Sequence, residues 1–447
     1  MQSKFKTACL MAGALLAAVP GVANAETTEL EQMRAEMAQM RAEMAQLKAD
    51  SQGDWMSDVR RAEIEGMIAD VFADAESRAT LLQEGALAGI DEKGKVFLQS
   101  ADGGFSMNIN GQIQFRYIWN NLEDRVDESV SGFQVRRTKL GFKGTVGDGW
   151  GYYVKLETNR DTANISMADA YVTKKLNDSV TMKAGAKKLP FARQELISSS
   201  RQVGVDRGLT TEFFTLGRSD MVEFTHKSDN LVLTAALSDG ANASYTDWNA
   251  DASNDFAVTA RADWMAIGDD WSAMKNEFGG VDEDALFVGA AVHYEVADGS
   301  AVIENGLAWT VDALYKTGAL GLTAAIFGNS TENVAAGTDT DQFGLYVQAD
   351  YDLGNDWDVF GRYEYIDDDG NAGAGTQELQ AVTFGVNNHI SNNVKFTADV
   401  VYIFDGDNPL ADGNTATDGE DSDALGLVGA VDGDDQVALR LQLQLLF

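Results

Sequence analysis

The stretch FSMNINGQIQFRYIWN, residues 105–120, alternates apolar and polar side chains at every second position. Phe105, Met107 and Ile109 begin one face, which continues with further apolar and aromatic residues to Trp119. Serine, asparagine, glutamine and Arg116 occupy the other face. A period of two indicates a β-strand with one apolar and one polar face. This stretch therefore predicts a long strand that separates an apolar environment from water.

The same alternation recurs to the end of the chain, where QVALRLQLQLLF, residues 436–447, repeats it. Sixteen such segments are predicted, at about 105–120, 132–146, 149–160, 164–176, 179–189, 221–228, 231–238, 254–264, 285–296, 306–317, 320–328, 342–353, 356–366, 378–390, 393–404 and 435–447. The connections between successive strands are numbered in chain order. The even-numbered connections are mostly tight turns, and the odd-numbered connections are mostly long and acidic. Two connections are exceptions: the eighth, 265–284, is long, and the third, 161–163, is short. An even number of antiparallel strands with short turns at one end is typical of an outer-membrane β-barrel.

A soluble β-sandwich would also alternate, but it would bury one face in a core. Here the polar face is rich in charge, and Trp and Tyr residues such as Tyr117, Trp150 and Tyr402 rim the apolar face. These features favour an all-β transmembrane barrel over the alternative of an acidic secreted β protein. A formal net charge of −36 also excludes nucleic-acid binding by neutralisation of phosphates.

The first 25 residues have the features of a secretory signal peptide. Lys4 and Lys6 precede an apolar run, and Ala23-Asn24-Ala25 is a small-residue cleavage site. The single cysteine, Cys9, lies within that run, so no disulfide or thiolate site is expected beyond it. We expect the signal peptide at 1–25, a coiled coil at 26–52, a helical linker at 53–94 and the barrel at 95–447.

Residues 30–50 repeat the heptad QMRAEMA, with Leu30, Met37 and Met44 at a positions and Glu36 and Glu43 at g positions. This pattern predicts an α-helical coiled coil between parallel subunits, on the periplasmic side of the barrel. A single amphipathic surface helix is the alternative. A coiled coil that tethers the membrane to the cell wall is a further alternative, although no wall-binding domain is recognisable.

Motifs for catalysis or metal binding are weak. The acidic segment 405–423 fails the spacing of a calcium loop because Pro409 stands at a ligand position. His226, His293 and His389 are scattered without metal-ligand spacing. No nucleophile motif occurs, so we expect neither an enzyme nor a cofactor or metal.

Several segments resemble the phosphate-selective porins O and P, a family of trimeric outer-membrane barrels. The matching segments are NINGQIQFRY at 108–117, RRTKLGFKGTVGDGW at 136–150, GAKKLPFARQELISSS at 185–200, FGLYVQADYDL at 343–353, GRYEYIDDDG at 361–370, FGVNNHISNNVKF at 384–396 and LRLQLQLLF at 439–447. The resemblance implies a homotrimer of sixteen-stranded channels in the outer membrane of a Gram-negative bacterium, in contact with its lipid and lipopolysaccharide. It also implies that the loop at about 190–220 folds into the lumen, that Lys and Arg line an anion or phosphate path, and that Phe447 belongs to a carboxy-terminal assembly signal.

Alternation assigns the side chains that face the lumen, where charge selects solutes. If Leu140 and Phe142 face lipid, their polar neighbours face inward. The predicted anion path comprises Arg116, Arg137, Lys139, Lys143, Lys155, Lys183, Lys187, Arg193, Arg201, Arg207, Arg218, Arg261 and Arg362. Later strands place carboxylates inward, among them Glu223, Asp263 and Asp312, which suggests one basic and one acidic wall. A non-specific or cation-preferring porin therefore stays open as an alternative, and many inward charges are expected simply to pair.

Overall fold

The computed structural model describes residues 86–90, 96–122, 129–160, 162–246, 254–297, 303–333, 338–368, 377–405, 425–427 and 435–447. The chain divides into two compact units, 1–81 and 82–447, and all described residues belong to the second. The expected signal peptide, the coiled coil and most of the helical linker lie outside the described residues.

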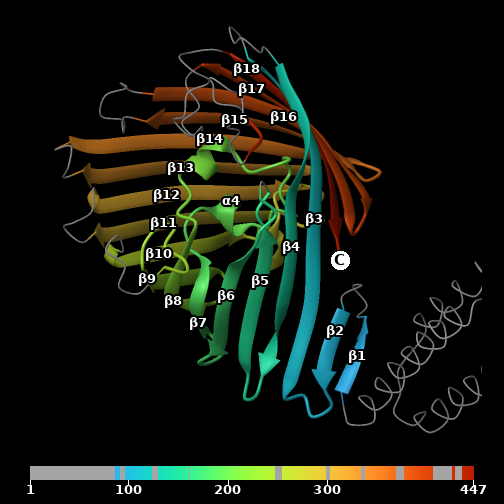
Figure 1. Cartoon of the computed structure of the whole chain (residues 1–447), viewed down its shortest axis with the longest axis vertical. Helices are drawn as coiled ribbons and strands as arrows, with labels where there is room; N and C mark the ends of the chain where they lie inside the picture. The colour runs from blue at the N-terminus through green and yellow to red at the C-terminus, as the bar shows by residue number, and fades with distance from the viewer. Residues whose placement is uncertain are drawn as a thin grey trace, which may run out of the picture. The chain divides into compact units, whose positions relative to one another are not determined.

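The described part is an antiparallel sheet whose strands follow one another in chain order (Figure 1). The strands are β1 (Ala86–Ile90), β2 (Val96–Ser100), β3 (Phe105–Leu122), β4 (Ser129–Val146), β5 (Trp150–Thr158), β6 (Ile165–Lys175), β7 (Val180–Lys188), β8 (Arg218–Lys227), β9 (Leu231–Ser238), β10 (Asn254–Ile267), β11 (Ala285–Ala297), β12 (Ile303–Thr317), β13 (Leu320–Asn333), β14 (Thr338–Gly354), β15 (Trp357–Asp368), β16 (Gln377–Ser391), β17 (Val394–Asp405) and β18 (Gln436–Leu446). β18 pairs with β3, which closes β3 to β18 into a barrel. The prediction of sixteen antiparallel barrel strands is confirmed.

Side chains along the barrel strands alternate between a polar inner face and an apolar outer face. In β3, Gln114 and Arg116 are buried inside, whereas Ile113 and Phe115 are 37% and 44% exposed. An apolar outer face suits a wall that meets lipid. Tight turns join the strands at one end, which we call the short-turn end. Between β14 and β15, for example, Gly354 and the two residues after it adopt φ of 74°, 53° and 65°.

Strand β1 corrects the prediction of a helical linker over the whole of 53–94. Its five residues pair with β2, and β2 pairs in turn with the start of β3, where Val96 lies opposite Ile109 (Figure 1). The pairing of β18 with β3 extends only to Leu446 opposite Gln112, and Phe447 exchanges backbone hydrogen bonds with Gly111. The β1–β2 hairpin thus forms backbone hydrogen bonds with the start of β3, which β18 leaves unpaired. This pairing favours a strand at 86–90 over the helix expected there.

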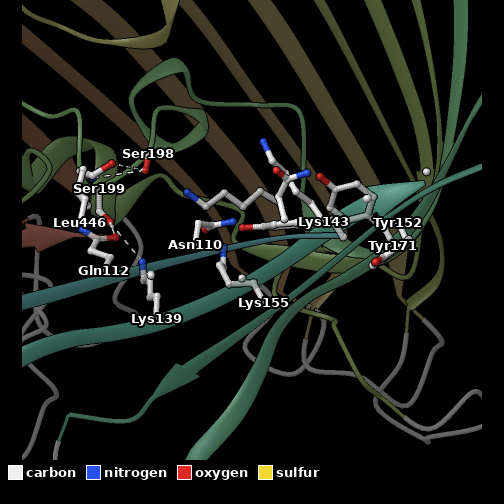
Figure 2. A pocket seen from close by; sticks show the side chains of 18 of the residues that line it. Asn110, Gln112, Lys139, Lys143, Tyr152, Lys155, Tyr171, Ser198, Ser199 and Leu446 are labelled. Carbon is white, nitrogen blue, oxygen red and sulfur yellow. Dashed lines mark hydrogen bonds between the residues drawn. The ribbon is translucent and has the colours of Figure 1, made fainter. Parts of the chain in front are cut away.

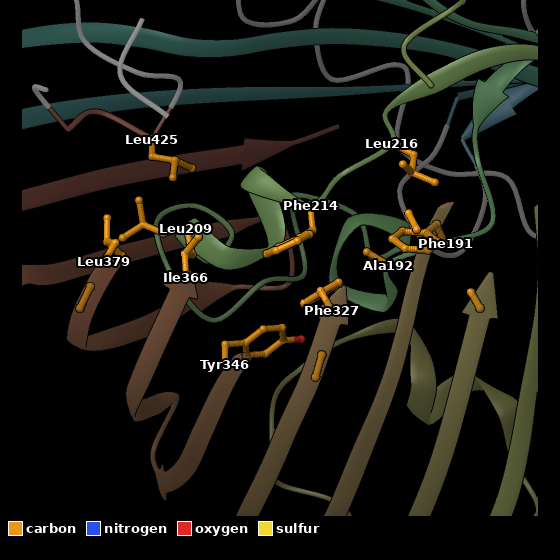
Figure 3. Close-up of a cluster of buried hydrophobic side chains, with 14 of the residues drawn as sticks. Phe191, Ala192, Leu209, Phe214, Leu216, Phe327, Tyr346, Ile366, Leu379 and Leu425 are labelled. Atoms are coloured by element: carbon orange, nitrogen blue, oxygen red, sulfur yellow. The ribbon is translucent and has the colours of Figure 1, made fainter. Parts of the chain in front are cut away.

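The connection from β7 to β8, residues 189–217, folds into the barrel and is called the lumen loop. It contains the short helices α4 (Arg193–Leu196) and α5 (Leu209–Phe213). Its buried apolar side chains pack against inward residues of the wall (Figure 3), and the rings of Phe214 and Phe327 stack with centroids 5.3 Å apart. The loop was expected to reach residue 220, but Arg218 already begins β8.

A second segment enters the lumen from the short-turn end. Residues 268–284 join β10 to β11, which is the link that was unexpectedly long in the sequence, and include the 3-10 helix η2 (Trp271–Lys275). Glu277 is 1% exposed and accepts hydrogen bonds from the Gln194 side chain (2.7 Å) and the Val203 backbone (3.1 Å) of the lumen loop. The two inserted segments therefore support each other. None of the described helices is long and apolar enough to span a bilayer.

Candidate functional site: the lumen lining

One buried aspartate fastens the lumen loop to the wall. Asp206 accepts hydrogen bonds from Arg116 at 3.0 Å, Arg136 at 3.0 Å and Arg137 at 2.5 Å. Burial alone would raise the pKa of Asp206, but the three guanidinium groups hold that pKa well below its usual range. Asp206 therefore stays ionised. Arg116 and Arg137, both predicted for the anion path, are engaged with the protein itself.

A β-bulge turns both Arg136 and Arg137 into the lumen. The pairing of β3 with β4 skips Arg136, which is an extra residue on β4. Strict alternation would turn Arg136 toward lipid, so it is absent from the predicted lining. A signal was present in the sequence, because Phe133 and Val135 fall on odd positions, whereas the apolar residues from Leu140 onward fall on even positions. Such a change of parity within one strand indicates a bulge.

The inward carboxylates of β10 and β12 are neutralised by two arginines. Arg261 of β10 pairs with Asp263 at 2.7 Å and with Asp312 at 2.8 Å. Arg193 of the lumen loop pairs with the same two carboxylates, at 3.0 Å and 2.5 Å respectively. All four side chains are buried. Arg193 and Arg261, predicted for the anion path, instead hold the lumen loop against this wall.

Glu364 of β15 and Asp399 of β17 are satisfied in a similar way. Each accepts a hydrogen bond from one barrel arginine and from one backbone N–H of the lumen loop. The four bonds are Arg362 to Glu364 (2.9 Å), Thr210 N–H to Glu364 (3.1 Å), Arg440 to Asp399 (2.7 Å) and Val205 N–H to Asp399 (3.0 Å). The lumen loop thus covers four inward carboxylates between β10 and β17 by bonding to each of them.

Lys183 and Lys187 of β7 share one carboxylate. Both pair with Glu223 of the neighbouring strand β8, Lys183 at 2.8 Å. Glu223 is 2% exposed, and strand pairing sets it opposite Lys183. These two lysines, also predicted for the anion path, are therefore members of a wall ion pair.

An open cavity of about 800 Å³ lies between the lumen loop and strands β3 to β7 (Figure 2). Figure 2 shows Ser198 and Ser199 of the loop on one side and Lys143 and Tyr171 of the wall on the other. No described Asp or Glu lines the cavity, but seven basic residues do: Lys139, Lys143, Lys155, Lys188, Arg201, Arg207 and Arg218.

Four of these basic residues also contact a carboxylate at the margin of the cavity. The pairs are Lys139 with Glu157 (3.3 Å), Lys155 with Asp169, Arg207 with Glu212 (3.0 Å) and Arg218 with Asp169 (2.8 Å). Lys188 donates to the backbone carbonyl of Glu195. Lys143 and Arg201 are exposed to the cavity and form no side-chain hydrogen bond or ion pair with any described residue.

A smaller cavity of about 360 Å³ adjoins the other end of the same wall. It is lined by residues at the ends of β5 and β6, among them Glu157 and Arg160, together with Arg136 and Arg218. Arg218 lines both cavities. Basic groups of β4, β5, β7 and β8 therefore line the two cavities, with Glu157 as an acidic member of the smaller one.

Two of the three scattered histidines have structural partners. His293 lies against Thr259 (2.8 Å) and Glu295 (3.1 Å), and His389 lies 2.7 Å from Asp358. Within the described residues, no group of three or more histidine, cysteine or acidic side chains is arranged to hold a metal ion.

A closed sixteen-stranded barrel with an apolar exterior, a polar lumen and an inserted loop defines the porin class of outer-membrane channels. The sequence matches the family model of the phosphate-selective porins O and P over residues 107–418, and the chain belongs to this family. The prediction of that family is confirmed. No curated protein is similar enough in sequence to count as a relative.

Solved structures share the fold at low sequence identity. The anion-selective porin of Comamonas acidovorans is 14% identical, with a TM-score of 0.55 over 77% of this chain and 100% of that one. OmpF of Salmonella typhi, solved with daunomycin, is 15% identical, with a TM-score of 0.54 over 76% and 98%. The DcaP channel of Acinetobacter baumannii is 13% identical, with a TM-score of 0.51 over 78% and 99%. At these identities the likeness concerns the fold alone.

Proposed function

We propose that this outer-membrane channel passes small anions in preference to cations by passive diffusion. The observation that carries the proposal is the composition of the open cavity, which is lined by seven Lys or Arg residues and by no described Asp or Glu. A basic lining replaces part of the hydration shell of an anion and repels cations. Inorganic phosphate, to which the family name refers, is one anion of suitable charge.

The covered carboxylates on the opposite side of the lumen also support this preference. Asp263, Asp312, Glu364 and Asp399 are buried and bonded to arginines, and none of them lines the cavity of about 800 Å³. A cation-preferring channel would need carboxylates on its path. The overall charge of −36 is therefore a poor guide to selectivity, because these inward acids are already paired.

The proposal includes the assembly expected from the family. The channel acts as a homotrimer in contact with membrane lipid and lipopolysaccharide, and its N-terminus lies in the periplasm. The coiled coil at 26–52, outside the described residues, would join the subunits there. No chemical conversion of the solute is required, because charge and size alone select what passes.

Conductance with exchanged ions tests the proposal. The purified full-length protein is inserted into planar bilayers, and single-channel conductance is measured in KCl, in potassium gluconate and in N-methylglucamine chloride. We expect conductance to fall steeply when the large gluconate replaces chloride and only modestly when the large cation replaces potassium. The reverse order would exclude an anion-preferring channel.

A further inference from the structure

A row of polar side chains on the basic wall lacks partners among the residues that the structure describes. Strand pairing aligns Asn108 of β3, Lys143 of β4, Tyr153 of β5 and Tyr171 of β6 side by side across the wall of the larger cavity. Their side chains form no hydrogen bond or ion pair with any described residue. Buried polar groups in a folded protein are normally satisfied, and the four arginine-bound carboxylates described above follow that rule. The unpartnered row therefore marks where a solute or water makes the bonds.

Two aromatic rings distinguish this row from a simple ladder of cations. Tyr153 and Tyr171 both line the cavity, with ring centroids 5.5 Å apart and planes inclined by 54°. The next position across the sheet, opposite Tyr171, is Gly185, which adds no side chain beside the ring. Inorganic phosphate would gain nothing from these rings, because it has no apolar surface to place against them.

Other polar residues of the cavity indicate what kind of ring-bearing solute fits. Asn110 and Thr173 also line the cavity, and their side chains likewise form no hydrogen bond with a described residue. Amide and hydroxyl groups both donate and accept hydrogen bonds, as sugar hydroxyls do. The C–H face of a pyranose ring packs on an aromatic face, and Lys143 supplies a charge for an anionic substituent. A benzoate-like anion would use the rings and the charge but would leave the amides unpaired.

We propose that the preferred solute is an anionic sugar, such as a hexose phosphate or a uronate, held at Asn108, Lys143, Tyr153 and Tyr171. This inference rests on the proposed anion preference, and it names the class of anion that the channel prefers. A cavity of about 800 Å³ has room for one such molecule.

Solute block of the single channel provides the test. Current through the full-length protein in KCl is recorded with added glucose 6-phosphate, glucuronate, inorganic phosphate, glucose or benzoate. We expect glucose 6-phosphate and glucuronate to block at concentrations about tenfold lower than phosphate, as one aromatic contact and one hydrogen bond would give. Equal block by phosphate, by glucose or by benzoate would overturn the sugar assignment.

Variants separate the role of the rings from the role of charge. The double variant Tyr153→Leu, Tyr171→Leu should weaken block by glucose 6-phosphate about fivefold more than block by phosphate, because phosphate can use the two hydroxyls but not the rings. Lys143→Gln should weaken both. The matched control is Tyr351→Leu, because Tyr351 lies on the outer face of β14 and is 50% exposed there. The pair Tyr153→Phe, Tyr171→Phe retains the rings and serves if the leucine pair does not fold, and its block by glucose 6-phosphate should weaken through loss of both hydroxyls.

An equal loss of both blocks in the tyrosine variants would refute the sugar proposal. A wild-type channel that prefers cations would refute both this proposal and the proposed function. A channel that prefers anions but does not distinguish glucose 6-phosphate from phosphate would refute the sugar proposal alone.

Discussion

Removal of the cavity cations that lack a carboxylate partner should change ion selectivity strongly. The perturbation is the triple variant Lys143→Gln, Lys188→Gln, Arg201→Gln. All three residues line the open cavity, and none forms an ion pair with a described carboxylate. Their replacement therefore leaves no acidic partner behind, in contrast to a change at Lys183 or Lys187.

Coulomb's law sets the size of the effect. An ion that passes about 6 Å from one such charge in water interacts with it by about 0.7 kcal/mol. Screening at physiological salt reduces this to about 0.3 kcal/mol. Because the charge attracts chloride and repels potassium, the permeability ratio changes by about 0.6 kcal/mol, or about threefold for each side chain. Three independent sites would together give a change of about twentyfold.

The assay is the zero-current potential of the variant and the wild type in the same KCl gradient. The control is Lys174→Gln, since Lys174 belongs to β6 but lies over the Trp150 ring on the outer side of the wall. We expect the control to retain the wild-type ratio. A triple variant with unchanged selectivity would refute the idea that ions travel along the basic wall.

Four further predictions concern the architecture around the cavity. Asp206→Asn should lower the temperature of the heat-induced gel shift, since loss of a buried ion-pair partner costs about 3–5 kcal/mol. The folded-state pKa of Asp206 lies below the ordinary aspartate pKa, so its ion pairs stabilise the protein at every pH above that ordinary value. This stabilisation is lost only as the pH falls through the folded-state pKa. The conductance of the wild-type channel should therefore be constant between about pH 7 and pH 5. Gly144→Ala should impair the pairing of β4 with β3, because a Cβ there would lie 1.7 Å from the backbone oxygen of Ser106, whereas Gly132→Ala in the same strand, with nothing within 4 Å, should assemble normally in gel-shift assays. Glu277→Ala removes a buried hydrogen-bond acceptor of the lumen loop, which costs about 1–3 kcal/mol of stability. The loosened loop should increase the current noise of the open channel. Current noise equal to that of the wild type would contradict the idea that Glu277 supports the loop.

The barrel could be predicted from the sequence because the alternation of apolar and polar residues that indicates each strand lies within that strand. Alternation in 105–120 and 436–447 sets which side chains face inward, and the structure pairs these two strands as barrel closure requires. The β1–β2 hairpin could not be predicted in this way. Its formation depends on where the last strand ends against β3, which is a non-local property.

The candidate site was only partly predictable, for a related reason. Alternation indicates that Arg137 faces the lumen, but not that Asp206, 69 residues further on, neutralises it. Arg136 was missed because a bulge breaks the alternation. Glu277 connects the β10–β11 segment to the lumen loop. The sequences of these two long connections have no periodic pattern from which their conformations could be predicted. Partners of this kind are set by tertiary packing, so the sequence indicated which charges enter the lumen but not which of them remain free.

The zero-current potential of the wild-type channel tests the central claim most directly. With a tenfold KCl gradient across a planar bilayer, a basic path predicts a potential displaced toward the chloride equilibrium value. A potential displaced toward the potassium equilibrium value would mean that the covered carboxylates of β10 to β17, and not the basic wall of β3 to β8, govern the passage of ions.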